Sequence, residues 1–428
     1  MKIAYLIPGC GVSGGIAVIC QHVNRLARRG HEVLLVAEGD ERAINWFPDQ
    51  QVPIVGVADY PPDVDILVAT AWSTAFRVAM LPARHKFYFV QSDETRFHPP
   101  GSAWEHITRM SYGLPFNYIT EARWIRAWLR KGFGHDVALV PNGLDPALFA
   151  PAEPLQAKGQ RPRILLEGAI GLPYKGMAEA FEAVAPLDVD VWCVSSYGKP
   201  QKHWKCDRFF EQVPMTEMPR IYSSCDVLVK LSRVEGFFGP PMEMMACGGA
   251  VVVGRVTGYD EYIVDGENAL VVDALVPSQA TEALRRILGD AGLRERLIEN
   301  GRRTAAQWQW EPSIDALEQR FLQVMEGKGV SCSDDQQKLA RSAAFFYGQL
   351  RGIDLEPRPE PSRAPAADAA PTPANAVAMP PAPVLHADDI GATERLIAWL
   401  RCKWWFRATA KVAWKARRSW RTVAGAVR

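Results

Sequence analysis

The segment from residue 226 to residue 253 constrains the fold most, because two apolar stretches enclose a turn rich in glycine and proline. Residues 226–231 and 250–253 have the apolar character of buried strands. Between them runs Glu235-Gly-Phe-Phe-Gly-Pro-Pro-Met-Glu243, whose two prolines suit the first turn of a helix, where a missing N–H costs nothing. We therefore expect Glu243 early on a helix and Glu235 at the end of the preceding strand. Open α/β sheets bind ligands at the carboxyl ends of parallel strands, so both carboxylates are candidate site residues.

The charge pattern of this turn leaves two interpretations open. A turn whose backbone N–H groups and helix dipole face a cleft favours a bound phosphate. Acidic residues at helix starts, however, are usually dipole partners, and turn carboxylates are usually solvated. The spacing of Glu235 and Glu243 alone is compatible with both a ligand site and an ordinary helix start.

The first 140 residues alternate between apolar strands and helical segments. The expected strands are 3–7, 33–37, 52–55, 65–69, 87–90, 117–119 and 137–140. The first strand runs into a glycine turn at 8–15, after which apolar residues recur at helical spacing. Such a unit can hold a phosphate, although structural turns of this composition are at least as common. The alternation predicts a parallel sheet covered by helices on both faces.

A second series of strands follows, at residues 163–167, 189–194, 209–213, 227–231 and 250–253, with a last one ending at 272. Lys175 opens the helix after the first of these strands. A cation at a helix N-terminus opposes the helix dipole unless an anion is bound there, so Lys175 indicates a diphosphate contact more than a solvated lysine. Residues 277–306 are predicted as two amphipathic helices, and a third begins at Trp310.

Two segments resemble one known family. Glu235-Gly-Phe, Pro240-Pro-x-Glu243 and Met-Ala-Cys-Gly248 together resemble the signature of retaining, family 4 type glycosyltransferases (glycosyl transferases group 1) of the GT-B fold. The turn at 140–151, Val-Pro-Asn-Gly-Leu-Asp-Pro-Ala-Leu-Phe-Ala-Pro, closely resembles the interdomain turn of the same family. The resemblance covers residues 2 to about 325, and Tyr-Phe-Val-Gln91 before an acidic pair is similar to bacterial rhamnosyltransferase-like members.

The resemblance implies an α/β chain with the GT-B fold, in which two doubly wound Rossmann-like domains face a cleft. Beyond it, a segment dominated by proline and alanine cannot bury a core and is predicted as a linker. The expected order is an acceptor-side domain, a donor-nucleotide domain, a crossover helix, a helical extension, a linker and a basic Trp-rich amphipathic helix. Their expected bounds are 1–145, 146–309, 310–326, 327–355, 356–390 and 391–428.

The resemblance also implies roles for individual residues around a nucleoside-diphosphate sugar between the domains. Glu235 would hold hydroxyls of the donor sugar, Glu243 would accept hydrogen bonds from the ribose, and Gln91 would make a polar contact near the transferred sugar. Lys175 would contact the diphosphate, and the remaining donor-binding positions would be Gly14, Gly15, Phe237, Phe238 and Gly239. Neither a metal nor a cofactor is expected, because Lys175 and the helix dipoles would stabilise the negative charge of the diphosphate.

Three positions depart from the pattern of the family. The arginine usual six residues before the lysine is Ala169, and the histidine usual near the transferred sugar is Gln91, which cannot act as a base. A position that is commonly glycine is Phe238, whose ring would narrow the sugar pocket. The loss of one cation predicts either compensation by another basic residue or a weaker donor site.

The chain ends in a basic segment. Residues 395–428 carry ten Lys and Arg side chains and no Asp or Glu, although the whole chain has a net charge of +1. At helical spacing the basic residues share one face and apolar residues, including Trp405 and Trp420, share the other, which fits a helix lying on an anionic membrane. The alternatives are docking on a partner protein and nucleic-acid contact, of which the second is not expected.

Cellular location is predicted from what the sequence contains. No apolar segment reaches the roughly 18 to 20 residues that span a bilayer. The eight cysteines are scattered without a Cys-x-x-Cys pair, which favours a reducing compartment. We expect a cytoplasmic protein that is peripherally associated with the inner face of the cytoplasmic membrane.

The sequence thus predicts a retaining glycosyltransferase that passes a hexosyl or deoxyhexosyl group to a hydroxyl of a glycan or lipid-linked acceptor, in bacterial cell-surface polysaccharide or glycolipid synthesis. The alternatives are a nucleotide-sugar epimerase or hydrolase of the same fold, and a glycan-binding protein recruited to the membrane by its basic tail. A glycoside hydrolase also uses paired carboxylates, but the phosphate-type turns argue against that class.

Overall fold

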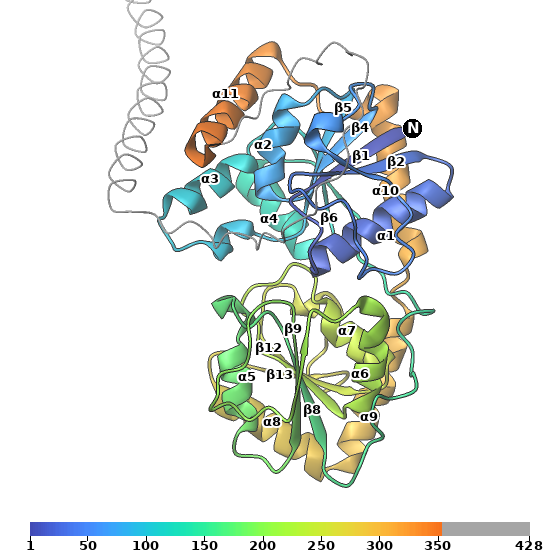
Figure 1. The fold of residues 1–428 in the computed structure, drawn as a ribbon, viewed down its shortest axis with the longest axis vertical. Helices are drawn as coiled ribbons and strands as arrows, with labels where there is room; N and C mark the ends of the chain where they lie inside the picture. Colours follow the sequence, from blue (N-terminus) through green and yellow to red (C-terminus); the bar gives the residue numbers. More distant parts are fainter. Residues whose placement is uncertain (353–428) are drawn as a thin grey trace, which may run out of the picture. The chain divides into compact units, whose positions relative to one another are not determined.

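A computed structural model describes residues 1–352, which contain two α/β domains, each built on its own parallel sheet (Figure 1). This architecture confirms the predicted fold class of two doubly wound, Rossmann-like domains. The expected linker at 356–390 and the basic amphipathic helix at 391–428 lie outside the described residues. Within residues 1–352, no helix combines the length and the apolar character needed to cross a membrane.

The first domain has a seven-stranded sheet in the order β3-β2-β1-β4-β5-β6-β7, in which every pairing is parallel. The strands are β1 (Lys2–Ile7), β2 (Glu32–Ala37), β3 (Ile54–Gly56), β4 (Ile66–Ala69), β5 (His85–Val90), β6 (Asn117–Thr120) and β7 (Val137–Leu139). The helices are α1 (Gly14–Arg28), α2 (Trp72–Met80), α3 (Ala103–Ser111) and α4 (Arg123–Phe133). Strands that are buried on both faces are apolar along their whole length, which is why the apolar runs of the sequence located them.

The second domain has a six-stranded parallel sheet in the order β10-β9-β8-β11-β12-β13. The strands are β8 (Arg163–Glu167), β9 (Asp190–Ser195), β10 (Arg208–Glu211), β11 (Val227–Lys230), β12 (Ala250–Gly254) and β13 (Leu270–Val272). The helices are α5 (Met177–Val184), α6 (Met218–Ser224), α7 (Gly239–Ala246), α8 (Pro277–Gly289) and α9 (Ala291–Ala306). In both sheets the strand order reverses, between β1 and β4 and between β8 and β11, and such reversals open a crevice for ligands.

Two local expectations need correction. Glu235 lies in the loop between β11 and α7 and not at the end of the strand, because the pairing of β11 with β12 stops at Lys230 and Val253. Lys175 lies in a single 3₁₀ turn (Pro173–Lys175) before α5 and not in the helix itself. The break is at Gly176, which has a left-handed φ of 63° and so separates the turn from α5.

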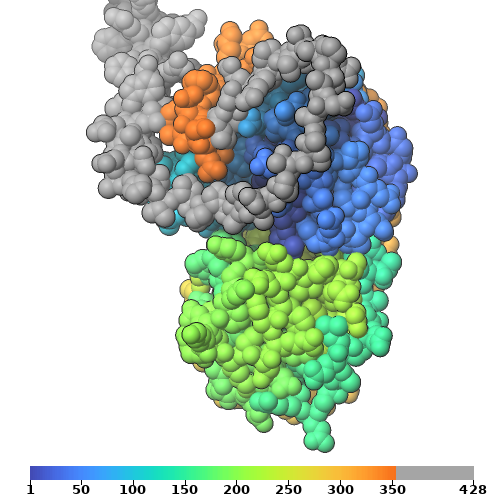
Figure 2. Space-filling model, viewed as in Figure 1, coloured from blue at the N-terminus to red at the C-terminus, as the bar shows by residue number. Residues whose placement is uncertain are grey.

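The chain returns to the first domain after α9. Helix α10 (Trp310–Gln323) buries Ile314, Leu317 and Phe321 in the core cluster of the first sheet. Helix α11 (Asp334–Arg351) lies beside α2, where Tyr347 stacks on Phe76 with ring centroids 4.7 Å apart. The C-terminal helices, drawn in orange, are accordingly seen beside the blue residues of the first domain (Figure 1 and Figure 2).

Candidate functional site

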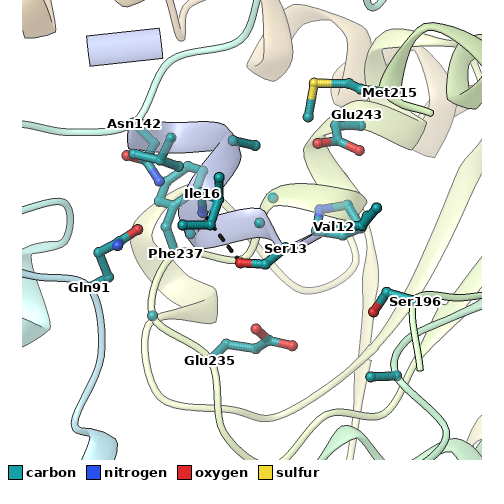
Figure 3. A pocket seen from close by; sticks show the side chains of 18 of the residues that line it. Val12, Ser13, Ile16, Gln91, Asn142, Ser196, Met215, Glu235, Phe237 and Glu243 are labelled. Atoms are coloured by element: carbon teal, nitrogen blue, oxygen red, sulfur yellow. Dashed lines mark hydrogen bonds between the residues drawn. The ribbon is translucent and has the colours of Figure 1, made fainter. Parts of the chain in front are cut away.

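A cavity of about 670 Å³ opens at the carboxyl ends of both sheets. Its lining includes the turn after β1, the residues after β4 and β5, and the loops after β8 and β11. Figure 3 shows Gln91 from the first domain and Glu235 and Glu243 from the second around this cavity. The cavity therefore coincides with the points of strand reversal, where open α/β sheets bind ligands.

The glycine turn after β1 places the N-terminus of α1 at the cavity. Ser13 caps this helix by accepting a hydrogen bond from the Ile16 backbone N–H at 3.3 Å (Figure 3). A Cβ atom on Gly14 would meet nothing within 4 Å, whereas one on Gly15 would lie 3.2 Å from the Gln91 side chain. Gly15 thus lets the Gln91 amide lie directly against the start of α1.

Gln91 follows β5 and lines the cavity. Its Nε2 donates to the Thr70 carbonyl at 3.4 Å, while its Oε1 is buried and has no hydrogen-bond partner within residues 1–352. A buried amide oxygen without a donor is unfavourable. Gln91 can therefore offer an acceptor to a ligand hydroxyl.

Lys175 and Glu235 form an ion pair inside the cavity. The Lys175 ammonium lies 2.9 Å from both carboxylate oxygens of Glu235, and Lys230 Nζ is 3.9 Å from Glu235 Oε1. Burial acts to raise the pKa of Glu235, but the charges of the two lysines outweigh this effect and lower the pKa below its usual value. Glu235 is therefore ionised at neutral pH, next to a cation that can bind phosphate.

Glu243 lies in the first turns of α7 and faces the same cavity. Its Oε2 accepts a hydrogen bond from the Tyr222 hydroxyl at 2.7 Å. Burial raises the pKa of Glu243 to about 7, although the Tyr222 hydrogen bond opposes the shift and the nearby charge of Glu167 adds to it. Small changes of pH near neutrality therefore change the charge of this carboxylate.

The loop between Glu235 and α7 differs in part from the expectation. The Phe238 ring is fully buried in the core of the second domain and does not line the cavity, so it does not narrow the cavity. The Phe237 N–H donates to Glu121 Oε1 at 2.9 Å, and the Gly239 N–H donates to the Phe237 carbonyl at 3.1 Å. These two N–H groups are thus occupied within the protein and do not face a ligand, whereas the Phe237 side chain lines the cavity.

Among the cavity residues that were not identified from the sequence, three charged ones end or follow a strand: Glu121 after β6, Glu167 at the end of β8 and Lys230 at the end of β11. Glu121 accepts a hydrogen bond from Asn142 Nδ2 at 2.9 Å, and burial raises its pKa to about 8. The available signal was a charged residue at the end of an apolar run, above all Lys230 in Val-Leu-Val-Lys. Within residues 1–352, no group of three or more His, Cys, Asp and Glu side chains is arranged to hold a metal ion.

The first domain holds the loop that carries Glu235. Trp124 Nε1 donates to the Gly236 carbonyl at 2.9 Å, in addition to the contact between Glu121 and Phe237. A Cβ atom on Gly236 would lie only 1.6 Å from the Gln91 carbonyl oxygen. A glycine is therefore required for this close approach of two backbone segments.

Comparison with solved structures confirms the predicted GT-B fold. The structure superposes on sucrose-phosphate synthase from Thermosynechococcus elongatus with a TM-score of 0.62 at 16% identity, covering 76% of this chain and 100% of that one. It also superposes on HepE from Anabaena, solved in complex with UDP-glucose, with a TM-score of 0.61 at 14% identity, covering 76% and 100% of the two chains. At these identities the likeness concerns the fold.

Sequence comparison matches part of the second domain to a protein family. Residues 206–304 match the family described as "Glycosyl transferases group 1". The chain is also 27% identical over 273 residues to the O-antigen biosynthesis protein RfbC from Myxococcus xanthus, a match that covers 61% of this chain and 21% of that protein. The chain thus spans about a fifth of the length of this relative. The match over residues 206–304 agrees with the family that the sequence motifs predicted.

Proposed function

We propose that this protein transfers a hexosyl or deoxyhexosyl group from a nucleoside-diphosphate sugar to a hydroxyl acceptor, with retention of the anomeric configuration. The proposal rests on one observation: Lys175, Glu235 and Glu243 line the same cavity. The glycines that begin helices α1 and α7 line this cavity too. Lys175 binds the diphosphate, Glu235 holds hydroxyls of the donor sugar and Glu243 accepts hydrogen bonds from the ribose. Gln91 contacts the sugar through the amide oxygen that lacks a partner within the described residues.

In the proposed reaction the acceptor oxygen bonds to the anomeric carbon while the bond from that carbon to the diphosphate breaks. The proton of the acceptor hydroxyl passes to an oxygen of the leaving diphosphate, so no protein base is required and Gln91 needs only to make a polar contact. The positive charge of Lys175 and the N-terminus of α1 stabilise the negative charge that develops on the diphosphate. No metal or cofactor is part of this proposal.

The names of related proteins support the substrate classes. RfbC is named for O-antigen biosynthesis, and HepE was solved with UDP-glucose. We accordingly propose a nucleotide-sugar donor and a glycan or lipid-linked acceptor in cell-surface polysaccharide or glycolipid synthesis.

Thermal stabilisation by a panel of nucleoside-diphosphate sugars tests this function. A ligand present at about 100 times its dissociation constant stabilises the folded state by about 2.7 kcal/mol, which is easily seen as a rise in Tm. We expect one nucleotide class to raise the Tm and its sugar to be transferred when an acceptor is added. Product analysis without acceptor distinguishes the alternatives, because epimerised or hydrolysed sugar in place of transfer would contradict the proposal.

Donor binding is expected to weaken at low pH because of Glu243. A carboxylate accepts stronger hydrogen bonds from ribose than a protonated carboxyl does. With a pKa of about 7, the ionised fraction rises from about one tenth at pH 6 to about nine tenths at pH 8, so donor affinity should rise about tenfold over this range. Calorimetric titration with the stabilising nucleotide sugar measures the effect. Glu243→Gln should flatten the profile, and an unchanged pH dependence in this variant would exclude Glu243 as its source.

We further propose that residues 395–428 attach the protein to an anionic membrane surface, because ten basic side chains there each contribute roughly 1 kcal/mol near such a surface. Deleting residues 357–428 should abolish co-sedimentation with phosphatidylglycerol vesicles and leave donor binding intact. Equal sedimentation of the full chain with neutral vesicles would contradict the proposal. Loss of donor binding in the truncated protein would show that the segment acts on the site instead.

A further inference from the structure

Two cations line the cavity in the described part of the chain, Lys175 and Lys230. Lys175 is ion-paired with Glu235. Lys230 ends β11 and its side chain is only 3% exposed. The three residues before it in the strand, Val227 to Val229, are fully buried and apolar. Lys230 is paired with Glu167, but apolar residues in place of a buried ion pair are often as stable or more stable, so stability alone does not account for Lys230.

The hydrogen bonds of Lys230 leave one N–H without an acceptor. An ammonium group has three N–H donors. Lys230 Nζ donates to the Glu167 carbonyl at 3.1 Å and to the Glu167 carboxylate. Its next polar neighbour among the described residues, Glu235 Oε1, is 3.9 Å away and beyond hydrogen-bond distance. The third N–H is therefore available to a ligand beside Glu235.

The charges in the cavity also call for a second cation. Six carboxyl groups line it: Glu94, Glu121, Asp145, Glu167, Glu235 and Glu243. Asp145 pairs with Arg25, and burial raises the pKa of Glu94 to about 7. Burial raises the pKa of Glu121 to about 8 and that of Glu243 to about 7, which reduces their charge at neutral pH. Glu167 and Glu235 are balanced by their lysine partners. A diphosphate brings about two further negative charges, which favours a direct contact from Lys230 as well as from Lys175.

We propose that Lys230 is a second phosphate-binding cation, which donates to an oxygen of the donor diphosphate while Glu167 positions its ammonium group. The proposal rests on the proposed donor site and adds a residue to it. It also explains how the chain binds a diphosphate with Ala169 in place of an arginine, because Ala169 and Glu167 line the same cavity at the end of β8. Glu167 is thus a positioning residue that acts through Lys230.

The test replaces the ion pair by apolar residues of similar size, in the variant Lys230→Met/Glu167→Leu. Such replacements of buried ion pairs are often neutral or stabilising, so the variant should fold. Calorimetric titrations measure the affinities for UDP and GDP and, by competition, for uridine and guanosine. We expect the affinity for the nucleoside diphosphate that binds the wild type to fall about 10- to 100-fold, as for the loss of a charge-assisted hydrogen bond. The affinity for the matching nucleoside should stay the same. An unchanged diphosphate affinity would overturn the proposal.

Two single variants separate the roles of the partners. Glu167→Gln removes the competing negative charge but keeps a side-chain oxygen and the backbone carbonyl as acceptors that position Lys230. Diphosphate affinity should therefore be equal or higher. A loss as large as in the double variant would assign the effect to the carboxylate. Lys199→Met removes a lysine that pairs with Glu211 outside the cavity and should leave both affinities unchanged. If the wild type binds no member of a full panel of nucleoside diphosphates, the proposed function itself fails. If it binds one and the double variant binds it equally well, only the role of Lys230 fails.

Discussion

Glu235→Gln is expected to lower kcat by about 100-fold or more, the size of effect seen when one preorganised electrostatic contact is removed from an active site. The amide cannot form the ion pair with Lys175, and its hydrogen bonds to sugar hydroxyls are weaker than those of a carboxylate. The affinity for the nucleoside diphosphate should be equal or higher, because Lys175 no longer has a competing partner. Steady-state kinetics of transfer, together with calorimetric titration of the diphosphate, measure the two quantities.

Glu179→Gln is the matched control for this variant. Glu179 also pairs with a cation of the second domain, Arg233, but it does not line the cavity. Its substitution should leave kcat close to the wild-type value. Transfer at a wild-type rate by a well-folded Glu235→Gln variant would refute the role assigned to Glu235.

Gly236→Ala is expected to lower kcat/KM about 100-fold, since a displacement of about 1 Å at a reacting centre costs this much. The new Cβ would lie 1.6 Å from the Gln91 carbonyl oxygen and 2.8 Å from Glu121 Oε1. A backbone oxygen cannot rotate away, so the loop with Glu235 must move relative to Gln91. The side chains proposed to bind the nucleotide, Lys175, Lys230 and Glu243, belong to the second domain, so the affinity for the nucleoside diphosphate should fall much less than kcat/KM.

Gly11→Ala provides the control, because a Cβ atom on Gly11 would meet nothing within 4 Å and Gly11 does not line the cavity. It should keep wild-type kcat/KM. If Gly236→Ala transferred sugar as fast as Gly11→Ala, the close approach of the two backbones would have no part in activity. If Gly236→Ala lost nucleotide binding as well, the substitution would disturb the second domain as a whole and not only the position of the Glu235 loop.

Much of this architecture could be predicted from the sequence because buried parallel strands are apolar throughout. Runs such as 163–167 and 250–253 locate strands without ambiguity, and the observed β8 and β12 have these positions to within one residue. The crossing of α10 into the core of the first domain depends on contacts between residues far apart in the chain. Periodicity located α10 as a helix, but only the family resemblance suggested where it packs.

The site was harder to predict because its details depend on side-chain direction. The position of Phe238 in the motif suggested a ring in the sugar pocket, but the turn at the start of α7 directs this ring into the core and presents Phe237 instead. Glu121 and Lys230 follow or end strands of different sheets, and their approach to one cavity depends on how the two domains meet. A charged residue at the end of an apolar run is a signal that could have identified both.

A structure of the protein with the nucleotide sugar that stabilises it most tests the central claim directly. We expect Lys175 Nζ to lie within about 3.2 Å of a diphosphate oxygen and the Glu243 carboxylate to lie at hydrogen-bond distance from a ribose hydroxyl. A nucleotide bound outside the cavity, or one inside it with its ribose turned away from Glu243, would contradict the account.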